Sequence, residues 1–505
     1  MRAIRTLLLL ALVWSGTAQA QEVQTSPAPD AVAVTIYRAP YRSATEKLSL
    51  DYLAGYALIT ETRTIRIPQG RAVIRFEGVA SGILPESAIV TGLPQGVREK
   101  NLDGELLSAA SLYNRGYARP VTLRRTRGGQ TIEERAIIRS GPAGSAIVET
   151  ERGFEVLNCG PTDDAIVYDA VPPGLSAKPT LSVETESPQA GTATVTLSYL
   201  AWGFDWQANY VATLREGAKT ADLFAWVTLA STDMTSFENA QTMMMAGKVN
   251  RTTGRTSNPY ESADTFEFKC YLPLDLGREE PLPPPPPPMA APPPPPPAPA
   301  MAEAIVVTGS RVRQVAQEDL GDLKAYRVPE PTTVAARSQK QVALLAKDAV
   351  PVSLVYASTI SFYGASPPQL RIRALNKTDK GLGLPLPAGP VALFERQNGR
   401  ELLIGESFTD DKAIGEEVEL KLSTASNLTL EFLARPGEPG RRPFELVLRN
   451  ANPFPVRFEA EFDIDENAVK DPSTPFTRKD GRNLWATTVH ANGTANLRYT
   501  VLVSR

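Results

Sequence analysis

The sequence contains one histidine, His490, in 505 residues. This scarcity excludes histidine-rich zinc sites and the H-E-x-x-H metalloprotease motif, because both need at least two histidines. A Ser-His-Asp triad would have to use His490, and no G-x-S-x-G nucleophile turn is present. His490 lies beside the turn-forming pair Asn492-Gly493, where we expect it to face solvent or to have a structural role.

Phosphate-binding glycine motifs are missing as well, so we expect neither a nucleotide nor another cofactor. Asp463, Asp465 and Asn467 resemble the opening of a calcium loop. Its sixth position is Ala468 and its twelfth is Thr474, where glycine and glutamate are needed, so we expect no metal site. Paired carboxylates for glycoside hydrolysis stay open, because their spacing is set in space and not in sequence. The absent motifs make an enzyme active site an unfavoured interpretation.

Cysteine is almost as scarce, with Cys159 and Cys270 alone. An oxidising compartment would permit a disulfide between them. The enclosed loop of roughly 110 residues would then contribute on the order of 4–5 kcal/mol in the chain-entropy model. Two buried free thiols are the alternative.

The chain also lacks a basic excess and a long apolar run. With 53 basic against 56 acidic residues, it has no electrostatic footprint for nucleic acid. Residues 1–20 have the order of a signal peptide: Arg2 and Arg5, then an apolar run at 7–13, then Ala18-Gln19-Ala20. No later stretch is long and apolar enough for a transmembrane helix. We therefore expect export through a cleavable signal peptide and no transmembrane segment thereafter.

Short alternating runs separated by glycine and proline turns fill most of the chain, which predicts a mainly β protein of several antiparallel sandwich-like domains with few short helices. The best helix candidate is 108–115, with Ser108 as N-cap. Pro68-Gln69-Gly70 predicts a hairpin between 57–67 and 71–76, and Asn398-Gly399 and Asn492-Gly493 predict two more. The run 341–346 is predicted as a strand, although its propensity also suits a helix.

The division of the chain follows from shifts in composition. We expect these parts: signal peptide 1–20, short lead-in 21–30, N-terminal β domain 31–175, central β region 176–280, proline-rich linker or loop 281–302, a β segment 303–380 that continues the central region, and a C-terminal immunoglobulin-like sandwich 381–505.

The stretch 199–251 has the densest apolar pattern in the chain. Trp202 and Trp206 alternate with polar residues, and Gly203 suits a bend between two strands. The aromatic side chains predict either a sheet core or a platform for a sugar or peptide. Polar side chains on the opposite face predict a solvated face or a ligand groove. The candidate ligand or partner surface is therefore Trp202, Asp205, Trp206, Gln207 and Asn209. The next run, 223–230, is apolar on both faces and predicts a strand covered on both sides.

The segments YLAWGFDWQANYVATL, WVTLASTDMTSFENAQ and MAGKVNR in this stretch resemble the bacterial family called domain of unknown function 4139. A second similar segment is GLGLPLPAGPVALFERQNGRELLIGESF at 381–408, and the resemblance extends over roughly 32–503. It implies an exported, β-rich envelope protein of the periplasm and supplies no site residues. At Ser231-Thr232-Asp233-Met234 the sequence departs from the Asn and Gly of the family's tight turn.

Residues 281–299 are mostly proline, which predicts polyproline II and no packed element. The segment is either a spacer or a ligand for a proline-binding partner. The following EAIVVTGSRVR resembles the start of the plug domain of TonB-dependent receptors over about ten residues. It predicts either a local strand or an added strand in a partner's sheet, formed by Val306, Val307, Thr308, Gly309, Ser310 and Arg311.

Together these features predict a non-enzymatic periplasmic protein that binds or scaffolds envelope components, with an envelope or outer-membrane protein as the expected partner. The alternative is a carbohydrate-binding or glycan-processing protein that uses the aromatic residues of the central stretch.

Overall fold

The computed structural model describes residues 22–43, 45–103, 106–127, 130–140, 146–157, 165–172, 175–247, 249, 315–320 and 323–503. These residues form two compact units: the first contains residues up to 32 and residues 60–200, and the second contains residues 33–59 and those from 201 onward. Strands dominate both units, which confirms the expected mainly β class with few short helices. None of the described helices has the length and apolar character that crossing a bilayer requires.

The first unit contains a four-stranded and a five-stranded sheet. The four-stranded sheet has the order β1 (Glu22–Ser26), β4 (Gly70–Glu77), β12 (Thr180–Ser187), β6 (Glu99–Asp103). The five-stranded sheet has the order β10 (Gly153–Val156), β9 (Ile147–Thr150), β8 (Gln130–Ile138), β7 (Pro120–Arg127), β11 (Ala165–Val167).

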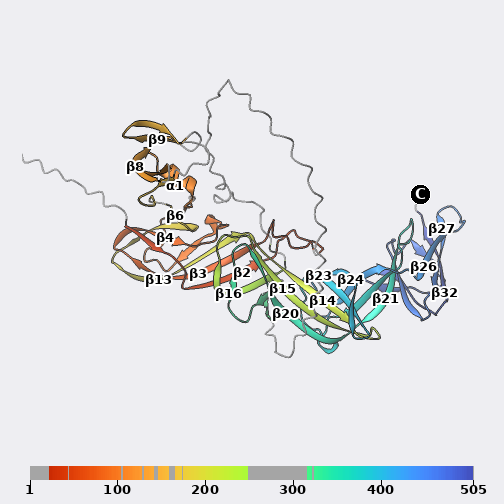
Figure 1. Ribbon diagram of the computed structural model, residues 1–505. Coiled ribbons are helices and arrows are strands. Elements are labelled where there is room, and N and C mark those ends of the chain that lie inside the picture. The colour runs from red at the N-terminus through yellow and green to blue at the C-terminus, as the bar shows by residue number, and fades with distance from the viewer. Residues whose placement is uncertain are drawn as a thin grey trace, which may run out of the picture. The chain divides into compact units, whose positions relative to one another are not determined.

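One α-helix, α1 (Ala109–Arg115), packs on the five-stranded sheet within the described residues. Figure 1 shows α1 beside β8, and Tyr113 shares an apolar core with Leu123 and Val148. Ser108 caps the helix as predicted, because its Oγ accepts a hydrogen bond from the Ser111 backbone N–H at 3.1 Å. A 3-10 turn, η1 (Pro85–Ser87), is a second helical element of the first unit.

A further sheet has eight strands. Its members are β17 (Ala316–Leu320), β18 (Leu323–Arg327), β16 (Phe237–Ala246), β2 (Ala31–Tyr37), β3 (Tyr56–Ile67), β13 (Gly191–Trp202) and β5 (Ile89–Thr91), with β19 (Thr332–Val334) paired to β16. The predicted hairpin at Pro68-Gln69-Gly70 is wrong. The strands β3 and β4 belong to different sheets, and β4 pairs with β1 and β12 instead. Gly70, with φ of +87°, turns the chain from one sheet into the other.

The second unit is built around a five-stranded sheet with the order β20 (Ser338–Pro351), β15 (Thr220–Ser231), β14 (Phe204–Leu214), β23 (Gly389–Gln397), β24 (Arg400–Thr409). Figure 1 shows β14, β15 and β20 side by side. The run 341–346 lies in β20, so the strand prediction holds there. The Asn398-Gly399 hairpin is also confirmed: both residues have positive φ, and Gln397 pairs with Arg400.

A two-layer sandwich completes the second unit. One layer has the order β25 (Glu417–Thr424), β22 (Gln369–Leu375), β21 (Ser353–Ile360), β28 (Val456–Phe462), β31 (Arg482–Val489), β30 (Thr477–Lys479). The other has the order β26 (Leu428–Ala434), β27 (Arg441–Asn450), β32 (Thr494–Leu502), β29 (Val469–Lys470). Phe462 and Tyr499, from opposite layers, meet edge to face with ring centroids 5.0 Å apart in one apolar core.

In this region the structure differs from the sequence-based predictions in two details. Asn492-Gly493 does not close a hairpin, because β31 and β32 belong to different layers of the sandwich. Sheet membership also divides the region differently from the boundary predicted at 381. The strands β21 and β22 precede that residue and belong to the sandwich, whereas β23 and β24 follow it and complete the five-stranded sheet. The 3-10 turn η2 (Thr378–Lys380) lies on the connection between β22 and β23.

Candidate functional site

The strand β14 carries most of the predicted ligand surface, and its aromatic side chains lie in the core. Gly203, with φ of +87°, separates β13 from β14, so the predicted bend is present. Trp206 is fully buried, and its indole Nε1 donates to the Met245 carbonyl oxygen at 3.1 Å. Trp202 ends β13, is partly exposed, and packs edge-on against Tyr56. The interpretation of Trp206 as a surface residue is therefore wrong, because its ring fills the interior.

Asp205 points to the other face of β14, but it is buried and not solvated. Its carboxylate accepts hydrogen bonds from the backbone N–H groups of Ala39 and Trp206, at 3.1 and 2.7 Å. Arg42 completes the set with Nε and Nη2, at 3.1 and 3.2 Å. Only 3% of the Asp205 side chain and 9% of the Arg42 side chain are exposed, so this is a buried ion pair.

Gln207, two residues further along β14, also binds backbone groups of the segment that follows β2. Its Oε1 accepts from the Leu48 backbone N–H at 3.2 Å, and its Nε2 donates to the Glu46 carbonyl oxygen at 3.0 Å. Both partners lie in residues 38–55, the connection between β2 and β3, which we call the anchored loop. The predicted solvated face or ligand groove at Asp205 and Gln207 is therefore wrong, because the anchored loop occupies it.

A further anchor joins the start of this loop to the segment after β24. Arg38 Nη1 donates to both carboxylate oxygens of Asp411, at 3.0 and 3.1 Å. The guanidinium carbon of Arg38 also lies 4.9 Å from the centroid of the Trp206 ring, a cation–π contact. The loop is thus fixed at several points over a strand and is not a free surface loop.

The two segments that carry the family resemblance meet in this region. The strands β14 and β23 run parallel, and the Tyr210 hydroxyl donates to the Pro387 carbonyl oxygen at 2.6 Å. Burial raises the pKa of Tyr210 well above its ordinary value, so the phenol remains a neutral donor. Gly389 allows the close approach, because a Cβ there would lie 1.9 Å from the Ala208 carbonyl oxygen. The resembling segments therefore form one packed substructure.

Large apolar side chains on the anchored loop point into solvent even though its backbone is fixed. The exposed fractions are 75% for Tyr41, 40% for Leu50 and 59% for Tyr52. A loop of this length without regular structure is uncommon in a compact domain and is usually functional. These three exposed apolar residues are therefore held on a loop whose backbone is anchored.

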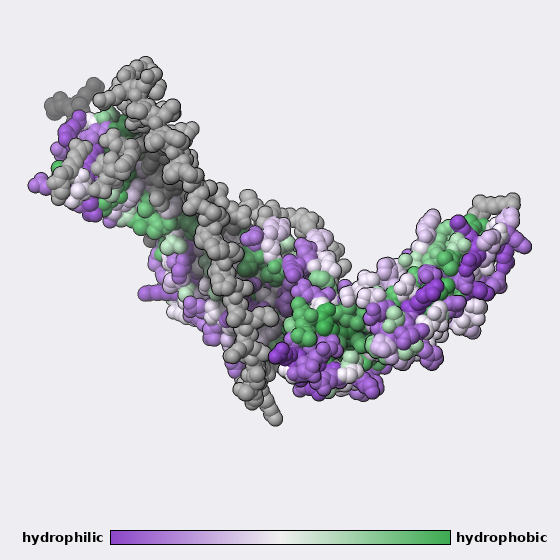
Figure 2. Space-filling model, turned by 45° about the vertical axis from the view of Figure 1, so that its right-hand side comes forward, coloured by the Kyte–Doolittle hydropathy of each residue, from purple (hydrophilic) through white to green (hydrophobic). Residues whose placement is uncertain are grey.

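The same face of the five-stranded sheet continues beyond the loop as a partly exposed apolar row. The cross-strand pairs Val211–Phe224 and Phe394–Leu403 lie on it, as does Trp226 opposite Asn209. Leu403 is 59% exposed, and the others are partly exposed. Figure 2 shows a hydrophobic patch in the part of the molecule where Figure 1 labels β14, β23 and β24. We call these five apolar residues the platform: Val211, Phe224, Trp226, Phe394 and Leu403.

The platform corrects the expectation that 223–230 is covered on both sides. Phe224 and Trp226 remain partly exposed and pack edge to face, with ring centroids 4.8 Å apart. Asn209, from the predicted ligand surface, borders Trp226 and donates to Thr228 Oγ1 at 2.8 Å. Of the residues predicted for the ligand surface, Asn209 thus borders the platform, Trp202 is partly exposed at the end of β13, and Trp206 is buried.

The platform side chains include no nucleophile and no titratable group, so they can bind but cannot transfer a proton. Within the described ranges, no group of three or more His, Cys, Asp or Glu side chains could hold a metal ion. His490 is exposed next to its turn, and Asp465 accepts from the Asn467 backbone N–H at 2.8 Å, as in an Asx turn.

Several predicted features lie outside the described residues: the signal peptide 1–20, Cys159, Cys270, the proline-rich segment 281–302 and the strand candidate formed by Val306, Val307, Thr308, Gly309, Ser310 and Arg311. No protein-family model and no curated protein matches this sequence.

Proposed function

We propose that this protein is a non-catalytic binding or scaffolding protein of the bacterial cell envelope, and that the platform with the anchored loop is its contact surface. The observation that carries the proposal is the fixed loop. Buried Asp205 and Gln207 hold a long loop in one conformation while Tyr41, Leu50 and Tyr52 remain in water. Retaining exposed apolar side chains on a rigid support is typical of an interaction site.

The apolar side chains favour a protein as the partner. Tyrosine, tryptophan and phenylalanine are enriched at protein interfaces, and tyrosine and tryptophan are frequent hot spots. A preordered loop also lowers the entropy cost of binding, because its backbone is already fixed. The periplasm as compartment rests on the signal-like residues 1–20, and membership of the domain of unknown function 4139 family rests on the segments quoted above.

The test compares three purified full-length chains for capture of partners from an envelope extract, followed by affinity measurement with each purified partner. The variants are Trp226→Ala and, as a matched control, Tyr363→Ala, whose ring is 91% exposed elsewhere in the same unit. We expect the control to bind like the wild type and Trp226→Ala to lose at least about 2 kcal/mol of binding free energy. Equal affinities for all three chains would refute the assignment of the contact surface.

A glycan is the second candidate ligand, because Trp226 has amide neighbours. Asn209 lies opposite it, and both Asn209 and Gln341 reach Thr228 Oγ1, at 2.8 and 3.4 Å. An aromatic ring beside amide groups offers apolar contact and hydrogen bonding together. Titration with soluble peptidoglycan fragments should then change tryptophan fluorescence in the wild type but not in Trp226→Ala. An unchanged wild-type spectrum would eliminate this candidate.

A further inference from the structure

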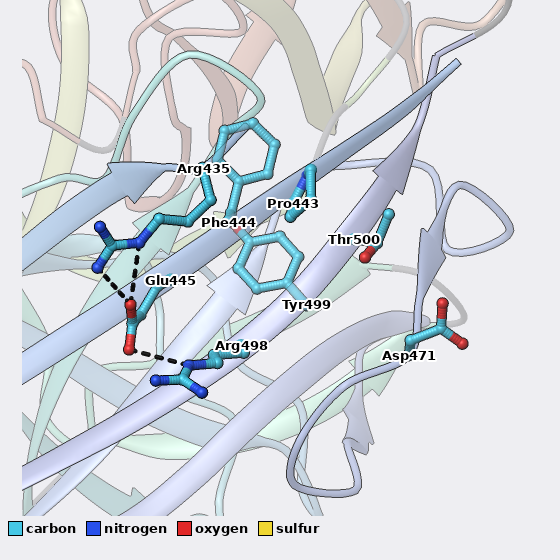
Figure 3. Close-up of a pocket in the computed structure, with 8 residues that line it drawn as sticks. All are labelled: Arg435, Pro443, Phe444, Glu445, Asp471, Arg498, Tyr499 and Thr500. Carbon is cyan, nitrogen blue, oxygen red and sulfur yellow. Dashed lines mark hydrogen bonds and ion pairs between the residues drawn. The ribbon is translucent and has the colours of Figure 1, made fainter. Parts of the chain in front are cut away.

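The four-stranded layer of the sandwich has a pocket on its outer face, with a cavity volume of about 320 Å³. It is lined by Arg435, Pro443, Phe444, Glu445, Asp471, Arg498, Tyr499 and Thr500, which Figure 3 shows. Arg435 follows β26, Glu445 lies on β27 and Arg498 on β32, so three neighbouring strands bring these charges together.

Glu445 lies beneath two arginines that remain accessible. Its side chain is 8% exposed, whereas those of Arg435 and Arg498 are 52% and 75% exposed. Arg435 donates to Oε2 through Nε and Nη2, at 3.1 and 2.6 Å, and Arg498 Nε donates to Oε1 at 3.1 Å. These bonds hold the pKa of Glu445 below its ordinary value, with Arg435 the largest cause and Arg498 the next. The carboxylate stays ionised and orients both guanidinium groups.

The arginines keep donors that Glu445 does not use. Each guanidinium has five N–H groups, and the bonds to Glu445 engage Nε and Nη2 of Arg435 and only Nε of Arg498. Asp471, on the far side of the pocket in Figure 3, forms an ion pair with Arg441. Arg441, which is not part of the lining, thus neutralises Asp471. Arg435 and Arg498 then face the single carboxylate of Glu445, which leaves an excess of one positive charge.

The remaining donors and the single excess charge define a ligand class. We propose that this pocket binds one carboxylate group of a small ligand, with Arg498 and Arg435 as the donors and the Thr500 hydroxyl as a further contact. A guanidinium fork matches a carboxylate in geometry. The cavity is at the lower end of the size range for small-molecule sites, so a single small group fits. This proposal is independent of the platform.

The test is calorimetric titration of the full chain with three probes: N-acetylalanine, which mimics a peptide terminus, galacturonic acid, which is an acidic sugar, and the uncharged methyl ester of N-acetylalanine. We expect saturable binding of at least one acid, with Kd on the order of 1 mM, and no binding of the ester. Preference for one acid identifies the source of the carboxylate. Failure of both acids to saturate, or equal binding of the ester, would overturn the proposal.

Three variants separate the pocket from general surface charge. Arg498→Gln should weaken acid binding by about tenfold or more, because charged hydrogen bonds are lost. The matched control is Arg449→Gln. Arg449 lies on the same face of β27 as Glu445 and is 61% exposed, but it pairs with Glu431 and not with Glu445. Thr500→Val leaves every charge in place and should also weaken binding, which decides the question if Arg498→Gln does not fold. The assignment of the pocket as a carboxylate site would be refuted if Arg449→Gln weakened acid binding as much as Arg498→Gln did. It would also be refuted if the single variants Arg498→Gln and Thr500→Val both kept full affinity for the acid.

Discussion

Replacing Asp205 by asparagine tests whether buried polar groups hold the anchored loop. The carboxylate accepts four hydrogen bonds, two from Arg42 and one each from the Ala39 and Trp206 backbone N–H groups. Asparagine keeps the volume but has one acceptor oxygen and no charge, so Arg42 loses its counter-ion. Removing one partner of a buried pair costs about 3–5 kcal/mol. The loop can detach and expose Arg42 to water, which limits the cost, and we therefore expect about 3 kcal/mol.

Hydrogen exchange measured by mass spectrometry distinguishes local release from global unfolding. A loss of about 3 kcal/mol corresponds to roughly 100-fold faster exchange of the Ala39 and Leu48 amides. Amides in the core of β15, such as Ala225, should keep their protection. Asn209→Ala is the matched control, since Asn209 lies on the same face of β14 but bonds to Thr228. Wild-type exchange at Ala39 and Leu48 in Asp205→Asn would refute the anchoring argument.

Three further predictions concern stability. Gly389→Ala should lower the free energy of unfolding by at least about 3 kcal/mol or prevent folding, because its Cβ would lie 1.9 Å from a carbonyl oxygen of β14. Thermal melting checks this, with Gly364→Ala as the control, since a Cβ at Gly364 would meet no atom within 4 Å. Glu459→Gln should cost about 3 kcal/mol in urea unfolding, since it removes the 2.6 Å partner of buried Arg373; a cost below about 1 kcal/mol would contradict the reasoning. Burial is the largest single influence on the pKa of Glu419 and raises it, but the hydrogen bond from Arg373 together with the charges of Arg371, Arg373 and Lys479 lowers the pKa overall. The ionised Glu419 therefore contributes fully to the free energy of unfolding above its unfolded pKa of about 4.3, and this contribution is lost as the pH falls through the lower pKa of the folded state. In Glu419→Gln, the free energy of unfolding measured against pH should fall less steeply in this acid range.

Local patterns predicted those elements whose causes are local. The strand β2 occupies 31–37, where alternating residues match the two-residue period of a strand. The helix α1 begins after Ser108, because a serine side chain can satisfy a backbone N–H of the first turn. At Asn398-Gly399, both residues tolerate positive φ, and the hairpin forms.

The same dipeptide at Asn492-Gly493 shows where local signals end. Positive φ at Asn492 turns the chain, but its flanking strands join different layers of the sandwich. The turn at Gly70 behaves in the same way between β3 and β4. Turn chemistry sets the direction of the chain, whereas the pairing partner depends on which sheet edge is free in the folded molecule.

The sequence by itself determined the mainly β class, the strands with clear alternation and the side of β14 on which Asp205, Gln207 and Asn209 lie. Only the tertiary structure decided which of these side chains face water. The loop 38–55 is distant in sequence, yet it covers Asp205 and Gln207 and leaves Trp226 partly exposed. Alternation fixes the face of a residue because it is a property of the backbone, but burial depends on what packs against that face, and long-range contacts decide this.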